Sequence, residues 1–123
     1  MKDFDDLIFR LNGAAMAVLN ELGHGFREKT YERSLCVELN YLGIQYDQQK
    51  VYPVYYRAIK VDEYIPDLEV AGVLLLDTKV VAKIGDIEIG QMLNFLKVTG
   101  KGIGLIQNFK HPKLEWRVVH QKN

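Results

Sequence analysis

The chain has 123 residues, of which 48% are hydrophobic and 26% charged, and its 16 basic and 16 acidic side chains cancel. This composition excludes a wholly disordered chain and predicts a single domain over residues 1–123, which buries about two-thirds of its unfolded surface. A lone cysteine, Cys36, excludes an internal disulfide, and no Cys and His pairs have the spacing of zinc ligands. We expect Cys36 to fill space between packed helices.

The sequence offers no recognisable targeting or membrane segment. Three of its first six residues are acidic, the basic start of a signal peptide is lacking, and no apolar run approaches about 18 residues. We therefore expect a cytoplasmic protein with no membrane partner.

Charge is distributed unevenly along the chain. Residues 1–77 hold 8 Lys and Arg against 13 Asp and Glu, a difference of −5, whereas residues 78–123 hold 8 against 3, a difference of +5. A net charge of zero counts mildly against a nucleic-acid partner. An acidic part beside a basic part nevertheless suits a cation site next to a surface that follows phosphate groups. Incidental asymmetry of a solvated surface explains the pattern equally well.

Two helices are expected first along the chain. Apolar residues recur with helical spacing over residues 4–22, which predicts an amphipathic helix that ends at Gly23-His24-Gly25. The same spacing predicts a second helix over residues 28–42, and Gly43 provides its stop.

The period then changes to that of strands. Runs rich in β-branched and aromatic residues predict strands at residues 51–56, 58–64, 65–70 and 73–81. The last run lacks alternation, so we expect a central strand that is covered on both faces. A helix over residues 87–99 and strands over residues 102–107 and 114–119 complete the chain. With adjoining runs taken together, the order α-α-β-β-β-α-β-β predicts an α/β fold in which helices flank a mixed central sheet.

A short pattern in the middle of the chain carries the chemistry. Pro66-Asp67 and Asp77-Thr78-Lys79 place two acids and a lysine on neighbouring predicted strands. A metal-dependent phosphodiester hydrolase needs such a set, because two carboxylates hold a divalent cation that activates water, and an ammonium group offsets the developing negative charge. Glu69, on the same side as Asp67, is expected to be an exposed charge at the rim of the sheet.

The register of the two strands decides whether the acids can share a cation, because side chains alternate between faces. With a two-residue loop, Ala71-Gly72, Asp67 points away from Asp77. With a three-residue loop over residues 70–72 and a left-handed Gly72, Leu75 faces Asp67, and the two acids lie on one side. We predict the odd-length loop or an equivalent bulge. Such hairpins are common, and one ion can bridge diagonal neighbours about 7–8 Å apart.

Further motifs resemble a known family. Residues 25–31 read as Gly-x-x-Glu-x-x-Tyr. Together with Pro66-Asp67-Leu68, Asp77-x-Lys79 and Gln91-Met-Leu-Asn-Phe95-Leu-Lys, they closely resemble the small bacterial GxxExxY family, which is placed in the PD-(D/E)XK nuclease superfamily. The resemblance covers about residues 11–119. It implies a restriction-endonuclease-like core with a central sheet of about four strands, and metal-dependent hydrolysis of nucleic acid as the ancestral chemistry.

The resemblance also implies roles for individual residues. Asp67 and Asp77 match the two strand ligands of the metal, and Glu28 matches a helical acid that helps to hold the metal or its waters. Lys79 matches the superfamily lysine, and Gln91 matches a helix glutamine beside the site. The implied metal ligands are thus Asp67, Asp77 and Glu28, the implied catalytic residues are Lys79, Gln91 and Glu28, and the implied cofactor is Mg²⁺ or Mn²⁺.

Two aromatic residues of the motifs are not expected to be catalytic. Tyr31 is expected to be a core or supporting hydroxyl, and Phe95 is the aromatic residue that follows the helix glutamine. His24, His111 and His120 are too scattered for a metal cluster, and the chain lacks a Walker loop, a dinucleotide fingerprint and a serine or cysteine nucleophile motif.

Departures from the family pattern keep two functions in competition. The second ligand is Asp77 where Glu is usual, and Ala82 and Glu88 stand where a further acid and a histidine are expected. One hypothesis is a Mg²⁺- or Mn²⁺-dependent nuclease acting on nucleic acid, DNA rather than RNA. The other is a weak or inactive module that binds nucleic acid or protein, as a homodimer or beside a larger partner. The tyrosines at positions 46, 52, 55, 56 and 64 either line such an interface or pack within strands, and packing is the expectation that we favour.

Overall fold

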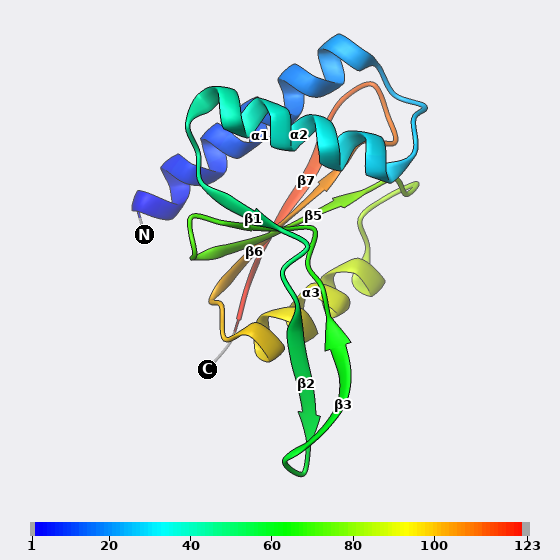
Figure 1. The fold of residues 1–123 in the computed structure, drawn as a ribbon. Coiled ribbons are helices and arrows are strands. Elements are labelled where there is room, and N and C mark those ends of the chain that lie inside the picture. Colours follow the sequence, from blue (N-terminus) through cyan, green and yellow to red (C-terminus); the bar gives the residue numbers. More distant parts are fainter. Residues whose placement is uncertain (1, 122–123) are drawn as a thin grey trace.

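The computed structural model describes residues 2–121, and side chains from residue 4 onward, as helices on both faces of a mixed β-sheet (Figure 1). The elements in chain order are α1 (Lys2–Leu22), α2 (Glu28–Leu42), β1 (Tyr46–Gln48), β2 (Tyr52–Tyr56), β3 (Ile59–Tyr64), β4 (Leu68–Val70), β5 (Leu74–Lys79), α3 (Asp86–Thr99), β6 (Ile103–Asn108) and β7 (Glu115–His120). This arrangement confirms the predicted α/β fold with a flanked mixed sheet.

The sheet has five strands in the order β1-β4-β5-β6-β7. Strands β5 and β6 are parallel, with α3 between them in the chain, and the other neighbours are antiparallel. The middle strand, β5, is buried from Leu74 to Thr78. The prediction of a central strand covered on both faces is therefore confirmed.

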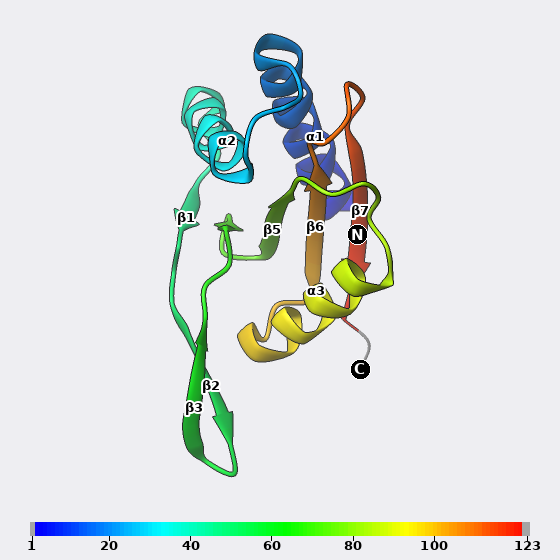
Figure 2. The ribbon, with the colours of Figure 1, turned by 90° about the vertical axis from the view of Figure 1, so that its right-hand side faces the viewer.

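Two apolar cores lie on opposite faces of the sheet, with α1 and α2 on one side and α3 on the other (Figure 2). Alternate residues of β5 divide between them: Leu74 and Leu76 join the α1–α2 core, whereas Leu75 joins the α3 core with Ile106 of β6. Cys36 is buried in the first core, which confirms its predicted role in helix packing. No helix within residues 2–121 is long and apolar enough to cross a membrane.

The strands before the acid pair differ from the expectation. Residues 46–48 form an edge strand that was not predicted, because three residues are too few for a clear alternation. Strands β2 and β3 pair only with each other and project from the body as a hairpin, here called the arm (Figure 1). Their β-propensity predicted strands correctly, but propensity does not specify the partner of a strand. The strand predicted at 65–70 is shorter than expected and begins at Leu68.

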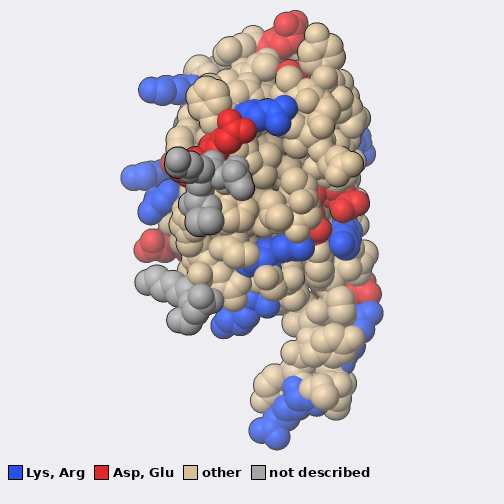
Figure 3. Space-filling view, turned by 90° about the vertical axis from the view of Figure 1, so that its left-hand side faces the viewer, with Lys and Arg blue, Asp and Glu red and all other residues tan. Residues whose placement is uncertain are grey.

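The separation of charge along the chain is not repeated on the face that Figure 3 presents. Acidic and basic side chains alternate over that side of the body, and a basic group marks the tip of the arm. The turn at that tip is made by Arg57 and Ala58, both with positive φ. This view favours the interpretation of the charge asymmetry as incidental to a solvated surface.

Candidate functional site

The hairpin between β4 and β5 determines how the two aspartates meet. Val70 pairs with Leu74, so the loop holds three residues, Ala71, Gly72 and Val73, and Gly72 has a left-handed φ of 70°. The predicted odd-length loop with a left-handed Gly72 is therefore confirmed. The pairing is displaced from the expected one: the ladder ends at Leu68 and Leu76, and the next position along sets Asp67 opposite Asp77 instead of opposite Leu75.

Asp67 is held against β5 by two hydrogen bonds. Its Oδ2 accepts the backbone N–H of Thr78 at 2.9 Å and the Thr78 hydroxyl at 3.0 Å. Burial raises the pKa of the Asp67 carboxyl, and the hydrogen bonds from Thr78 oppose this rise. Asp67 is thus a fixed carboxylate that uses one oxygen for its own orientation.

Asp77 is the most deeply buried acid of the pair, with 6% of its surface exposed. Burial raises the pKa of its carboxyl to about 7, and the charge of Asp67 acts in the same direction against the opposing effect of Lys79. No Lys, Arg or His of the described chain forms an ion pair with Asp67 or Asp77. Two neighbouring buried carboxylates that have no cationic side chain as a partner repel each other. Their repulsion favours the binding of a cation from solution.

Lys79 and Gln91 come together across the sheet and α3. Lys79 lies two residues after Asp77, so both side chains project from the same face of β5. The Lys79 ammonium donates a hydrogen bond of 2.9 Å to Oε1 of Gln91. The charge of Lys79 opposes the rise in the pKa of Asp77 and of Glu28, so Lys79 lies within electrostatic reach of both acids.

Glu28 reaches the same neighbourhood from the first residue of α2. Glu28 as a whole residue is exposed, but its carboxyl group is partly buried. This partial burial is the main cause of a raised pKa of the Glu28 carboxyl, and the charge of Asp67 is the second cause. Lys79 and the backbone N–H of Val80 oppose that rise. Glu28 thus lies within electrostatic reach of Asp67, Asp77 and Lys79, and these four residues, with Gln91 bound to Lys79, are here called the acid cluster.

The approach of α2 to this cluster is fixed by Tyr31. The Tyr31 hydroxyl donates to the carbonyl of Gly23 at 2.7 Å and accepts the N–H of Phe26 at 3.1 Å, so it ties down the loop before α2. The ring is fully buried and stacks on Phe109, with centroids 4.7 Å apart. The prediction that Tyr31 is a core residue with a supporting hydroxyl is confirmed.

The burial of two further acids, Glu32 and Glu69, was not predicted. Glu32 accepts hydrogen bonds from Lys29, Gln48 and Gln49. Burial acts to raise its pKa, but these bonds hold the pKa of the carboxyl below its ordinary value. The signal for Glu32 was its place beside Tyr31 on the inward face of α2.

Glu69 corrects the expectation of an exposed charge at the rim. It is 2% exposed, accepts a hydrogen bond from Tyr52 and lies 3.6 Å from the Lys50 ammonium and 3.7 Å from that of Lys101. Although burial acts to raise the pKa of Glu69, Tyr52 and the two lysines hold it below its ordinary value. Glu69 was misread because β4 is covered on both faces, so that alternation cannot expose it. It is neutralised by its own partners and is not available to a cation.

The donor set of the cluster fits a hard divalent cation. Within residues 2–121, no three Asp, Glu, His or Cys side chains form a ready group of metal ligands. Mg²⁺ does not require one, because it usually binds one or two protein carboxylates and keeps several waters. Asp67 and Asp77 supply this number of oxygen ligands, and the role of Glu28 as a ligand stays a prediction.

The two departures after the lysine have structural roles. Glu88 lies at the start of α3, where its Oε1 accepts the N–H of Gly85 at 2.8 Å and caps the helix. The carbonyl of Ala82 lies 2.7 Å from Nε2 of His111, and this contact joins the loop before α3 to the loop before β7. The bond from Gly85 and, less strongly, the charge of Lys79 lower the pKa of Glu88, so its carboxylate is committed to the cap although it lies within electrostatic reach of Lys79.

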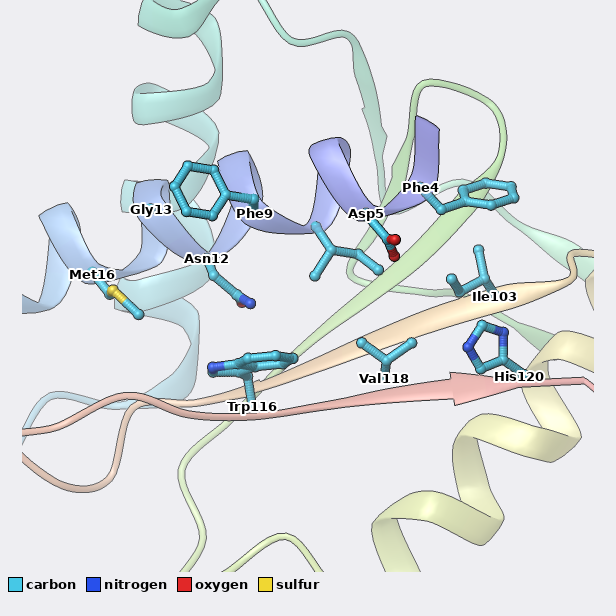
Figure 4. Close-up of a pocket in the computed structure, with 11 residues that line it drawn as sticks. Phe4, Asp5, Phe9, Asn12, Gly13, Met16, Ile103, Trp116, Val118 and His120 are labelled. Carbon is cyan, nitrogen blue, oxygen red and sulfur yellow. The ribbon is translucent and has the colours of Figure 1, made fainter. Parts of the chain in front are cut away.

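A separate apolar groove of about 580 Å³ lies on the α1 side of the sheet (Figure 4). The exposed rings of Phe9 and Trp116 face each other across it, from α1 and β7. None of the clustered acids, nor Lys79, lines this groove. The groove and the acid cluster are therefore distinct features of the molecule.

Comparison with protein families gives a match. The family model described as the PD-(D/E)XK nuclease superfamily matches residues 5–119 of the chain. This range includes the buried residues of both cores and every residue of the acid cluster. Comparisons with curated proteins and with solved structures yield no match.

Proposed function

The chain belongs to the PD-(D/E)XK nuclease superfamily, and from this premise we propose that it is a divalent-metal-dependent nuclease that hydrolyses phosphodiester bonds of nucleic acid, with DNA as the expected substrate. The observation that carries the proposal is the pair of neighbouring acids, Asp67 and Asp77, with no cationic partner of their own and with Lys79 beside them. The Gly-x-x-Glu-x-x-Tyr motif at residues 25–31 supports placement in the GxxExxY group.

Asp67 and Asp77 are the proposed ligands of Mg²⁺ or Mn²⁺. Asp67 is held in place by Thr78, and Asp77, with a pKa of about 7, is only partly ionised near neutral pH until a positive charge is bound. Glu28 approaches from α2 and is proposed to hold the cation or its waters from the open side. When bound, the cation supplies a nucleophile from water at neutral pH and a positive charge for the phosphate.

Lys79 is the proposed stabiliser of the charged phosphate during attack. Its hydrogen bond to Gln91 orients the ammonium, which lies within electrostatic reach of Asp77, and the remaining donors of the ammonium can bind a phosphate oxygen. Gln91 is proposed to orient Lys79 or the attacking water. In the overall reaction, water adds to phosphorus, the P–O ester bond breaks, and the leaving oxygen takes a proton.

A second candidate is a nuclease-fold module that binds nucleic acid or a protein partner without cleaving it. The exposed aromatic side chains of the arm favour it: Tyr55 and Tyr56 are 62% and 65% exposed, and Arg57 lies 5.8 Å from the Tyr56 ring. Rings and cations together are suited to stacking on bases and to phosphates. A homodimer or a larger protein partner is part of this alternative.

Cleavage assays separate the two candidates. Labelled single- and double-stranded DNA and RNA would be incubated with the protein in Mg²⁺, Mn²⁺ or EDTA. We expect wild type to cleave DNA only with a divalent ion, and Lys79→Ala and Asp77→Asn to lower the rate by about 100-fold or more. Lys113→Ala, which removes an exposed lysine away from the cluster, is the matched control.

Cleavage that survives in EDTA or in both variants would show a contaminating nuclease. Absence of cleavage across all substrates and both ions would defeat the nuclease proposal. Retardation of the same substrates in a gel, without cleavage, would then support the binding module.

A further inference from the structure

Tyr64 links the arm to the acid cluster. It is the last residue of β3, and its ring stacks on Phe95 of α3, with centroids 3.7 Å apart and planes 16° from parallel. The ring packs against the α3 core, which also contains Leu75 and Met92. The stack holds the ring in place without any contribution from its hydroxyl group.

The hydroxyl of Tyr64 is buried and has no hydrogen-bond partner among the described residues. Three other buried or half-buried tyrosines differ in this respect: Tyr31 donates to Gly23, Tyr46 to Cys36, and Tyr52, which pairs with Tyr64 across the arm, to Glu69. Leaving a buried hydroxyl unpaired costs stability, and this cost calls for a reason.

The surroundings of the hydroxyl indicate what it would bind. The ring packs against the core that holds Leu75, and Asp77 projects from the same face of β5 two residues further on. Burial raises the pKa of Tyr64, and the charges of Asp77 and Asp67 raise it further, so both acids lie within electrostatic reach of a hydroxyl that bonds to neither. Towards two carboxylates the phenol acts as a donor. The oxygen is enclosed in the cation-free structure, so its partner has to be as small as a water molecule and has to enter together with the cation.

We propose that Tyr64 is a positioning residue of the acid pair, whose hydroxyl donates a hydrogen bond to a water that accompanies the divalent cation between Asp67 and Asp77. This inference rests on the proposed function, because it assumes that the acids bind a cation. It explains why a hydroxyl is kept at a site where phenylalanine would pack equally well. Groups that hydrogen-bond to the ligands of a metal orient them and strengthen metal binding.

Tyr64→Phe tests the proposal because it removes one oxygen and keeps the stack on Phe95. Calorimetric titration with Mn²⁺ in the absence of nucleic acid should give a dissociation constant about 10-fold larger than that of wild type. Tyr41→Phe is the matched control, since its hydroxyl belongs to an exposed side chain at the far end of α2; its Mn²⁺ affinity should equal that of wild type. In EDTA, thermal unfolding of Tyr64→Phe should occur at or above the wild-type temperature, because no protein hydrogen bond is lost.

The possible failures can be told apart. If wild type binds Mn²⁺ and Tyr64→Phe binds it equally well, the role of Tyr64 is wrong and the nuclease proposal stands. If Tyr64→Phe unfolds at a clearly lower temperature in EDTA, the hydroxyl serves a structural bond and the inference is also overturned. If wild type binds no divalent ion, the proposed function and this inference fail together.

Discussion

Asp77 is a residue whose burial opposes stability. In the unfolded chain its carboxyl ionises near the ordinary value of 3.8, whereas in the folded chain burial, with the charge of Asp67, raises its pKa to about 7. Between these values the unfolded chain releases a proton that the folded chain retains. The free energy of unfolding therefore falls as the pH rises from about 4 to about 7, and above that range the full cost of the ionised, buried acid remains.

We predict that Asp77→Asn is more stable than wild type at neutral pH. In EDTA the two proteins should differ little near pH 4, and the variant should gain up to about 4 kcal/mol by pH 8, at roughly 1.4 kcal/mol for each unit of the shift from 3.8 to about 7. Urea unfolding at several pH values measures this difference. Asp47→Asn, at an exposed position of β1, is the control and should follow the wild-type profile.

A bound cation should reverse the difference, because it binds the ionised acids of the folded chain only. Saturating Mn²⁺ should stabilise wild type at pH 8 and leave Asp77→Asn unchanged. A pH profile that is identical in the two proteins would contradict the burial argument. The same experiment would show whether stability is given up to keep a site ready for a cation.

At the scale of elements, α3 approaches the sheet closely because β6 carries a glycine. Gly104 is buried beside Leu75, and a methyl group added to it would lie 2.5 Å from Sδ and 2.8 Å from Cγ of Met92. The position of α3 matters to the site, since this helix carries Gln91 and Phe95. The absence of a side chain at Gly104 thus helps to place both residues.

Gly104→Ala should destabilise the protein by about 1–3 kcal/mol, because Met92 has to move within a packed core. Gly102→Ala is the matched control on the same chain segment, where an added methyl meets nothing within 4 Å. Denaturant unfolding compares the two variants. A smaller effect of Gly104→Ala in a Met92→Ala background would confirm the contact, whereas strictly additive effects would contradict it.

Elements with a strong local pattern were predictable, and those defined by distant partners were not. The helices follow from apolar spacing, and the burial of β5 follows from an apolar run without alternation. The acids were found from their spacing and from the odd-length hairpin, since parity alone sets them on one side. The exact register, the partners of Glu69 and the neighbours of Tyr64 depend on how separate elements pack, and no local pattern contains that information.

At the scale of the whole molecule, the body and the arm are stabilised in different ways. The body has an apolar core on each face of its sheet, whereas the arm is a two-stranded ribbon that projects from it (Figure 2). Isolated hairpins of this kind are marginally stable in water. The arm is attached at its base, where Tyr64 stacks on Phe95 and Tyr52 donates to Glu69, and its far end carries exposed side chains such as Tyr56 and Ile59.

Amide hydrogen exchange should therefore follow a gradient along the arm. Amides near Tyr56 and Ile59 should exchange fastest, through local opening that costs little free energy, and amides near Tyr52 and Tyr64 should be slower because the base is anchored. Peptides from β5 and β6 should exchange only through unfolding of the whole molecule, and they serve as the internal reference. Equal protection of the tip and of β5 would show that the arm is covered by something other than its own two strands. A gradient that persists in wild type but flattens in Phe95→Ala would show that the stack on Phe95, and hence the packing beside the acid cluster, anchors the arm.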